Sequence, residues 1–512
     1  MRGLMRRLME GRRGRAGAAV AAAVVLCGVP ALSGAAAVAD TGTTATAGAG
    51  ATDPYVFAEG AQDVRGAQNS ADAPRLKTGE TYRSSLGSGP SAAAYYRVEL
   101  DGAANAYVSV VVVPPLGSGV KAAYSDGVTL TLQDDKGDRC DAQRATFRAG
   151  TFPRPVAAVA ERLVRPGGLR CQAAGTYYVA VERKAEADST NAAWDLELRV
   201  ATEPGLVTPE PTAGPRTWPS ASVQPPSGNG AQRSGGTGFN DARALSSGVW
   251  KDRIAPGQSH FFRVPVNWGQ QLSVDTALGS ATGDASRGAT VAAALDTELY
   301  NPARASVAAK DVLYSGDPTS TTFDPLPPVA YENRYLLRDD QTAMRFAGWY
   351  YLKVSLNPAM ARKFGAGASA VTVRVTVDGE VTQPPDYVRD AGEFQVTGAD
   401  LKAAERGDGG AVWAGTEAAG SGDSAGEGGG ASAGSGSGAG SGSGAGGGSG
   451  SSSGSGSGSA PADAASASST SSGSAAMTVL GVAGIGTGTA LLLMLGVWRV
   501  VAVRRLRVRV RG

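Results

Sequence analysis

An internal repeat constrains the fold of this 512-residue chain more than any other feature. Two stretches, about residues 53–202 and 239–380, carry the same motifs in the same order. The repeated motifs are region 72–86 (again at 241–254, one residue shorter), Tyr-Tyr-Arg-Val 95–98 (Phe-Phe-Arg-Val 261–264), Pro-Val-Ala 155–157 (328–330) and Ala-Gly-Thr-Tyr-Tyr 174–178 (Ala-Gly-Trp-Tyr-Tyr 347–351). The last two pairs share one offset of 173 residues. We therefore expect two copies of one structural unit.

Both copies alternate apolar and polar residues with period two, the pattern of half-buried β-strands. In the first copy the alternation predicts strands at 95–100, 106–113, 128–133, 176–182 and 194–200. In the second copy it predicts strands at 260–266, 271–277, 290–295, 349–356 and 370–377. A short helical turn is expected at 157–164. Short strands separated by Gly, Asp and Pro turns predict an all-β fold of two tandem antiparallel β-sandwiches.

The order of these motifs resembles a known family. A Leu-x-x-Gly start, an aromatic-aromatic-Arg-Val strand, a Val-rich strand, the turn Asp134-Asp135-Lys136-Gly137 and Ala-Gly-x-Tyr-Tyr resemble the bacterial pre-peptidase C-terminal (PPC) domain. That resemblance covers both copies, and it implies a jelly-roll-like sandwich of the kind appended to secreted enzymes or strung along envelope proteins. Asn-Trp-Gly-Gln at 267–270 is similar to membrane-anchored envelope proteins of high-GC Gram-positive bacteria. No peptidase domain precedes either copy, and the Asp-x-Ser-x-Ser motif of von Willebrand factor type A domains, which some of those proteins carry, is missing. The resemblance therefore implies an accessory or adhesive role.

The two ends of the chain predict export and anchoring. Six arginines, an apolar run at 16–29 and Ala-Val-Ala at 37–39 predict a signal peptide over 1–39. An uncharged stretch at 477–498 would span roughly 33 Å as a helix, enough to cross a bilayer core of about 30 Å. The arginine-rich tail 499–512 should stay in the cytoplasm. We expect a single-pass cell-membrane protein with an extracellular ectodomain.

Three segments have the composition of disordered chain. Residues 40–52 are rich in Thr, Ala and Gly, and 203–238 carry seven prolines among Gly and Ser, which predicts a linker. Residues 406–475 are almost wholly Gly, Ser and Ala, which predicts a flexible stalk.

Cysteine usage fits an oxidising compartment. Cys27 lies within the signal, so Cys140 and Cys171 remain and are expected to form one disulfide, with a reactive thiol pair or a metal pair as the alternatives. Cys171 aligns with Met344 in the second copy, where an apolar side chain should pack in place of the sulfur.

The charge balance bears on the partner class. Without the signal and the anchor with its tail, the chain keeps 36 basic and 45 acidic residues, a net charge of about −9. This argues against nucleic acid or an anionic lipid surface as the partner.

Few residues suggest catalysis or metal binding. The single histidine, His260, is most simply a strand-edge or loop-facing residue, and Gly-Ser-Ser-Ser-Gly at 450–454 matches a nucleophile motif only through low complexity. Converging carboxylates could bind a cation, and one acidic cluster offers them: Asp134, Asp135, Asp138 and Asp141. A solvated turn is the simpler interpretation of this cluster, and calcium is the alternative. No other cofactor is expected, and acid/base carboxylate pairs drawn from distant positions stay open.

Adjacent aromatic pairs are the remaining candidates for a binding surface. In a strand, one member of each pair faces the core and the other faces outward, where it serves either ligand stacking or sheet stability. The pairs are Tyr95 and Tyr96, Tyr177 and Tyr178, Phe261 and Phe262, and Tyr350 and Tyr351. In the membrane segment, the spacing of Gly484 and Gly488 permits a homodimer.

These observations favour a non-enzymatic, membrane-anchored cell-surface protein. Two β-sandwich binding modules would serve adhesion, ligand capture or envelope assembly of an unidentified cell-wall or protein ligand, and repetition would give avidity. The alternative is an accessory subunit that holds or regulates a separately encoded secreted hydrolase. An enzyme in its own right is the third hypothesis.

Overall fold

The computed structural model describes residues 54–117, 119–165, 167–208, 211–281 and 288–409. The expected signal peptide, the membrane helix with Gly484 and Gly488, the basic tail and nearly all of the expected stalk lie outside these residues. Within the part of the chain that is described, no helix is both long and apolar enough to cross a membrane.

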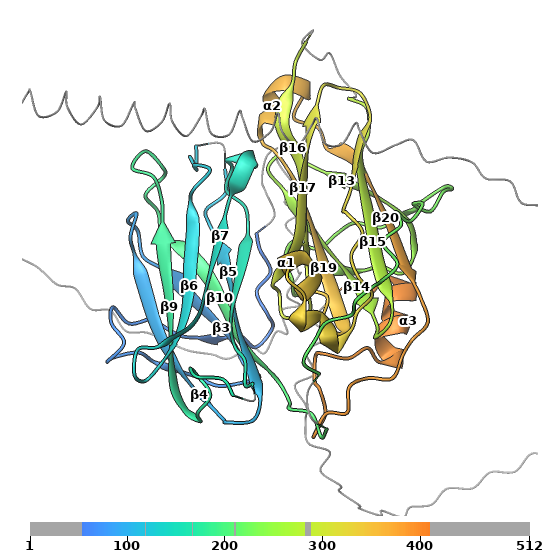
Figure 1. Cartoon of the computed structure of the whole chain (residues 1–512). Coiled ribbons are helices and arrows are strands. Elements are labelled where there is room, and N and C mark those ends of the chain that lie inside the picture. Colours follow the sequence, from blue (N-terminus) through green and yellow to red (C-terminus); the bar gives the residue numbers. More distant parts are fainter. Residues whose placement is uncertain (1–53, 118, 166, 209–210, 282–287, 410–512) are drawn as a thin grey trace, which may run out of the picture. The chain divides into compact units, whose positions relative to one another are not determined.

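The described residues are mostly β-structure and form four five-stranded sheets, which pair into two β-sandwiches (Figure 1). One sheet of the first sandwich has the order β1 (Gln62–Asp63), β3 (Thr81–Leu86), β10 (Trp194–Glu203), β5 (Asn105–Val113) and β8 (Val156–Arg162). Its partner has the order β2 (Arg75–Leu76), β4 (Ala93–Leu100), β9 (Gly175–Lys184), β6 (Gly127–Asp134) and β7 (Arg139–Thr146). The mainly aliphatic core between them includes Cys171.

The second sandwich has the same architecture. One sheet has the order β11 (Ala231–Gln232), β13 (Gly248–Ile254), β20 (Ser369–Asp378), β15 (Gln271–Leu278) and β18 (Thr319–Thr322). The other has the order β12 (Arg243–Ala244), β14 (Ser259–Val266), β19 (Gly348–Leu356), β16 (Val291–Tyr300) and β17 (Ser306–Tyr314). Short helical turns interrupt it: η2 (Tyr331–Tyr335), α1 (Asp339–Thr342) and α2 (Ala359–Phe364), while η1 (Arg148–Gly150) lies in the first sandwich.

The repeat seen in the sequence is present in the topology. Each strand of the first sandwich has its counterpart ten strands later, and the order of the eight longer strands is that of a double Greek key. The two-residue strands β1, β2, β11 and β12 pair in parallel, whereas the other ladders are antiparallel. Tyr177 donates to the carbonyl of Ala173, and Tyr350 donates in the same way to Phe346. Met344 is buried in the second core, as the alignment with Cys171 predicts.

The ten predicted strands all overlap strands of the structure, but the predicted helical turn at 157–164 is wrong. Residues 156–162 form β8, an edge strand paired with β5. Val156 to Ala160 are buried, so β8 shows no apolar-polar alternation that could reveal a strand. The two Pro-Val-Ala motifs do not occupy equivalent positions. The first leads into β8, where Val156 pairs with Val112 of β5. The counterpart of β8 is β18, residues 319–322, which pairs with β15 and ends before the second motif.

Two segments outside the repeats pack against the sandwiches. The expected linker 203–238 begins with the buried end of β10, and Leu206 forms a β-bridge with Tyr387. Farther along, Pro219 accepts a hydrogen bond from Gln271, and β11 pairs with β13. Residues 385–408 follow the second sandwich and contain α3 (Gly398–Arg406), whose first turn is held by a capping box between Thr397 and Asp400. The sequence left 385–405 unassigned, and Arg406, the expected start of the stalk, is instead the last residue of α3. We call residues 385–408 the clasp.

Candidate functional site

Strand burial shows which sheet faces are covered. In β3 and β4 buried residues alternate with more exposed ones, as in half-buried strands. In β5, β10, β16 and β19 nearly every residue is buried. Their outward faces pack against each other, because one apolar cluster combines Val111 and Ala157 of the first sandwich with Phe261, Tyr300 and Tyr351 of the second.

The docked faces are not equivalent in the repeat. The first sandwich uses the sheet that contains β5, β10 and β8, whereas the second uses the sheet that contains β14, β19 and β16. Among the described residues, the counterparts of these sheets contribute none to this apolar cluster. The packing is therefore heterologous, and the two copies present different faces to solvent.

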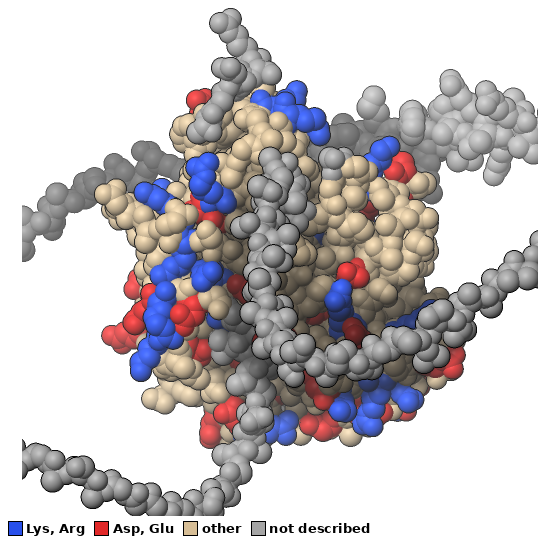
Figure 2. Space-filling model, turned by 180° about the vertical axis from the view of Figure 1, so that it is seen from behind, with Lys and Arg blue, Asp and Glu red and all other residues tan. Residues whose placement is uncertain are grey.

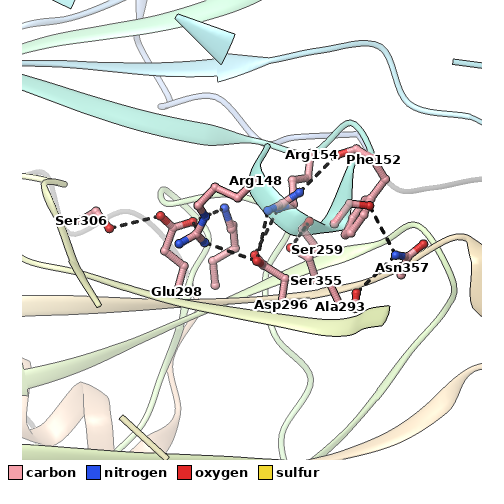
Figure 3. Close-up of polar contacts among 12 residues, drawn as sticks. Arg148, Phe152, Arg154, Ser259, Ala293, Asp296, Glu298, Ser306, Ser355 and Asn357 are labelled. Carbon is pink, nitrogen blue, oxygen red and sulfur yellow. Dashed lines mark hydrogen bonds and ion pairs between the residues drawn. The ribbon is translucent and has the colours of Figure 1, made fainter. Parts of the chain in front are cut away.

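Buried ion pairs fix the docking at one end of the contact. Arg154 binds both carboxylate oxygens of Asp296, with Nε–Oδ1 and Nη2–Oδ2 distances of 3.2 and 3.1 Å (Figure 3). Arg148, one third of whose side chain is exposed, reaches both Asp296 and Glu298. Lys353 is buried and donates to the Pro155 carbonyl of the first sandwich at 2.8 Å and to Glu298 at 2.9 Å.

Electrostatics keep Glu298 ionised in this setting. Burial by itself raises the pKa of a carboxyl, but Lys353 and Arg148 outweigh burial and lower the pKa of Glu298. The contact is thus held by paired charges that are removed from solvent.

A second set of contacts joins three parts of the chain. Glu203, at the end of β10, is fully buried and accepts hydrogen bonds from Arg334 of the second sandwich at 2.7 and 3.3 Å. Tyr107 of the first sandwich and Tyr387 of the clasp each donate to the same carboxylate at 2.8 Å. Asn105 donates a fifth hydrogen bond at 2.9 Å.

The clasp inserts further side chains beside this carboxylate. Glu393 pairs with Arg199 of β10 at 2.5 Å. Phe394 is fully buried and lies 4.5 Å from Phe346 and 5.5 Å from Tyr107 between ring centroids. The sandwiches and the clasp therefore share one apolar cluster, and the clasp secures the contact.

A cleft of about 470 Å³ lies beside the docked faces and takes its walls from both sandwiches. This is within the usual volume range of ligand pockets. Small residues from two edge strands make up much of its lining, 157–159 of β8 and 305–309 around the start of β17. Charged residues border it: Asp141, Arg144, Arg148, Glu161, Asp339 and Arg345.

Most of these charges already have partners. Arg345 pairs with Glu161 across the two sandwiches, and Asp141 accepts the Glu161 backbone amide at 3.1 Å. Burial raises the pKa of Asp141, and the hydrogen bond from the Glu161 amide offsets this only in part. The described residues that line the cleft are mostly polar or small, are close to charge balance and include no aromatic one. Elsewhere, Figure 2 shows acidic and basic side chains interspersed on the face in view.

The predicted disulfide is confirmed: Cys140 of β7 is bonded to Cys171 in the loop before β9. The acidic cluster does not converge as a cation site would. Asp134 accepts the backbone amides of Lys136 and Asp138 within its own turn, whereas Asp141 lies in the cleft. No group of three or more His, Cys, Asp or Glu residues suited to a metal ion occurs in the described ranges.

The aromatic pairs divide between the copies. In the first copy, Tyr96 and Tyr177 are buried in the core, and Tyr95 and Tyr178 are partly exposed on the outer face, as predicted. In the second copy the alternation also holds, because Phe262 and Tyr350 are in the core and Phe261 and Tyr351 are on the outer face, but these two are buried in the contact between the sandwiches. Docking covers the second copy's outer face.

His260 also differs from its expected setting. It lies within β14, is buried, and its Nδ1 is 2.5 Å from the carboxylate of Asp252. Neither residue lines the cleft. The residues that do line it were missed by sequence reasoning, apart from Asp141, because they come from strands brought together only by docking.

Comparison with known proteins gives no family. No family model matches the chain, and no curated protein matches it. Among solved structures, the tandem CBM51 modules of Sp3GH98, a family 98 glycoside hydrolase of Streptococcus pneumoniae, match with 8% identity over 59% of this chain and 84% of that chain, at a TM-score of 0.16. The ANX1 ectodomain of Arabidopsis thaliana matches with 11% identity over 60% of this chain and 92% of that chain, at a TM-score of 0.17. Similarity at this level carries no argument about function, and the resemblance to PPC domains stays a sequence-based expectation.

Proposed function

We propose that this protein is a non-enzymatic, membrane-anchored surface protein whose two sandwiches act as one ligand-binding body. The observation that carries the proposal is the cleft beside the docked faces, because its walls come from both sandwiches and exist as a site only when the two are docked. Extracellular display by a single C-terminal anchor is the part of the proposal that comes from the sequence.

Heterologous docking changes what the repeat can provide. Two independent modules would offer two equivalent sites and gain avidity. Here each copy covers a different face, so equivalent positions such as Tyr95 and Phe261 have different exposure. The duplication supplies two unlike walls for one site.

The chemistry of the cleft supports binding better than catalysis. Glu161 is paired with Arg345, and Asp141 accepts a backbone amide, so these carboxylates are engaged in structural contacts. The only histidine is paired with Asp252 away from the cleft.

Site-specific photocrosslinking on intact cells tests the proposal. A benzoylphenylalanine at Ala309, in the cleft, should form a covalent adduct with the ligand, whereas the same residue at Ser320, an exposed position of β18, should form none. Equal adducts at both positions, or none at Ala309, would contradict a binding cleft. An adduct with a secreted hydrolase would favour the accessory-subunit function over adhesion or envelope assembly.

Protease treatment of the same cells tests display. Cleavage of the ectodomain from intact cells is expected, and full protection would contradict an extracellular location.

A further inference from the structure

We infer that the ligand of the cleft is an extended polypeptide segment that adds as a strand to the free edge of β17. This inference rests on the proposed function, since it names the ligand class for the same cleft.

Among the described strands, β17 is the terminal one of its sheet and pairs with β16 alone. An edge strand leaves a row of backbone N–H and C=O groups without strand partners, and such a row is a template for another chain. The first half of β17, Ser306 to Ala309, lines the cleft. A second pocket of about 230 Å³ shares Val307, Ala308 and Ala309 and continues along the strand to Lys310.

The side chains beside this edge are small enough to let another backbone approach. Ala308 and Ala309 lie on β17, and Ala157 and Ala158 of β8 also line the cleft. Five residues of β17 span roughly 16 Å, which fits a strand of four or five residues.

β8 is also an edge strand, but it is less open to pairing. The carboxylate of Asp141 already accepts the backbone amide of Glu161 in β8. Among the described residues, no side chain accepts a hydrogen bond from a backbone amide of β17, so β17 is the edge available to a ligand.

The composition of the walls argues against other ligand classes. None of the described residues that line the cleft is Phe, Tyr or Trp, so they offer no face for stacking a sugar ring or a base. Its charges are largely paired, which suits a backbone of neutral dipoles better than a polyanion.

The positive charge of Arg148 beside β17 favours a peptide with an acidic side chain. Arg148 binds Glu298, and Glu298 is the register partner of Ala309 in β17, so the guanidinium lies beside the strand. Together, Arg148, Arg154 and Lys353 contribute three positive charges against the two carboxylates that they contact. Arg148 is the most exposed of these five residues and can take an acidic side chain of the ligand.

Peptide selection on the full chain in detergent tests the inference. The probe is a pool of N-acetylated, C-amidated octapeptides with one central Glu and only Ala, Ser, Thr or Val elsewhere. We expect enrichment of sequences that bind the native chain, with at least tenfold weaker binding to A309R, in which a long side chain extends into the cleft from the outer face of the sheet. The matched variant S320R, on the edge strand β18, should bind like the native chain.

Methylation of the peptide's backbone amides tests strand pairing directly, without a protein variant. The best peptide, N-methylated at alternate residues along the edge that pairs, should bind at least tenfold more weakly, because each methyl group removes a donor. Equal binding of the methylated peptide, or no enrichment over A309R, would overturn strand addition. If photocrosslinking at Ala309 still captures a ligand, the proposed function survives and only the ligand class is wrong.

The cleft could instead hold the chain's own Gly/Ser-rich segment or a second copy of the chain, and each of these gives a distinct result. If removal of residues 410–475 raised the affinity for the peptide tenfold, the cleft would belong to the chain's own Gly/Ser-rich segment. If A309R alone abolished self-association, the cleft would belong to a second copy. Either result would overturn an external peptide as the ligand.

Discussion

Replacing Glu203 with Gln should destabilise the two-sandwich body more than any exposed substitution. Its carboxylate accepts five hydrogen bonds, from Arg334 (two), Tyr107, Tyr387 and Asn105. Gln keeps the shape but removes the charge, and its amide group replaces one acceptor oxygen with a donor. Arg334, only 4% of whose side chain is exposed, would keep a buried charge with no compensating anion.

The expected cost is about 3–5 kcal/mol in the free energy of unfolding, the range for breaking a buried ion pair by removing one partner. This is a large share of the roughly 5–15 kcal/mol that stabilises a typical domain. Urea unfolding of the full chain in detergent, followed by tryptophan fluorescence, measures it. Because Glu203 contacts both sandwiches and the clasp, E203Q should also begin to separate one unfolding transition into two.

Two matched variants make the result interpretable. The Arg83–Asp195 pair is 3.9 Å long with both side chains half exposed, so D195N should cost less than about 1 kcal/mol. The double variant E203M/R334M removes both charges, and its free energy of unfolding should exceed that of E203Q by about 2 kcal/mol or more. If E203Q unfolds within 1 kcal/mol of the native chain, the buried carboxylate does not hold the sandwiches together.

Three further outcomes are expected. Burial alone would raise the pKa of Glu203, but Arg334 and the donated hydrogen bonds lower it. The carboxylate therefore stabilises the fold above the unfolded pKa of about 4.3, and this stabilisation is lost as the pH falls below it. E203Q should lose less stability than the native chain between about pH 4 and 2, and an equal loss would contradict this. F394A should cost about 3–5 kcal/mol and speed amide exchange in β5, and unaltered exchange there would show that the clasp does not secure the contact. Replacing Cys140 and Cys171 together with Ala should cost about 3–4 kcal/mol for a loop of 31 residues, measured by urea unfolding against native chain with and without reductant.

Local pattern predicted the strands whose two faces have different environments. β4 alternates between buried and more exposed residues, and its repeat at 261–264 places β14 at the equivalent position of the second copy. β8 has no such alternation, since Val156 to Ala160 are buried on both faces, and the sequence therefore misassigned it. The clasp was missed because its helix is short and its apolar residues are few.

The site was far less predictable than the strands. Glu203 and Arg334 are 131 residues apart, and no spacing or motif marks them as partners. Of the residues around the cleft, only Asp141 was singled out, and for a cation that its neighbours do not help to bind.

By itself, the sequence determined two copies of one all-β unit, most of their long strands and the Cys140–Cys171 bond, because side-chain periodicity and the repeat act within each copy. Only the tertiary structure decided that unlike faces of the two copies dock, that Phe261 and Tyr351 become buried while Tyr95 stays partly exposed, and that β8 and β17 border one cleft. The physical reason is that docking depends on the fit of whole sheet faces and on ion pairs between distant positions, neither of which leaves a local pattern in the chain.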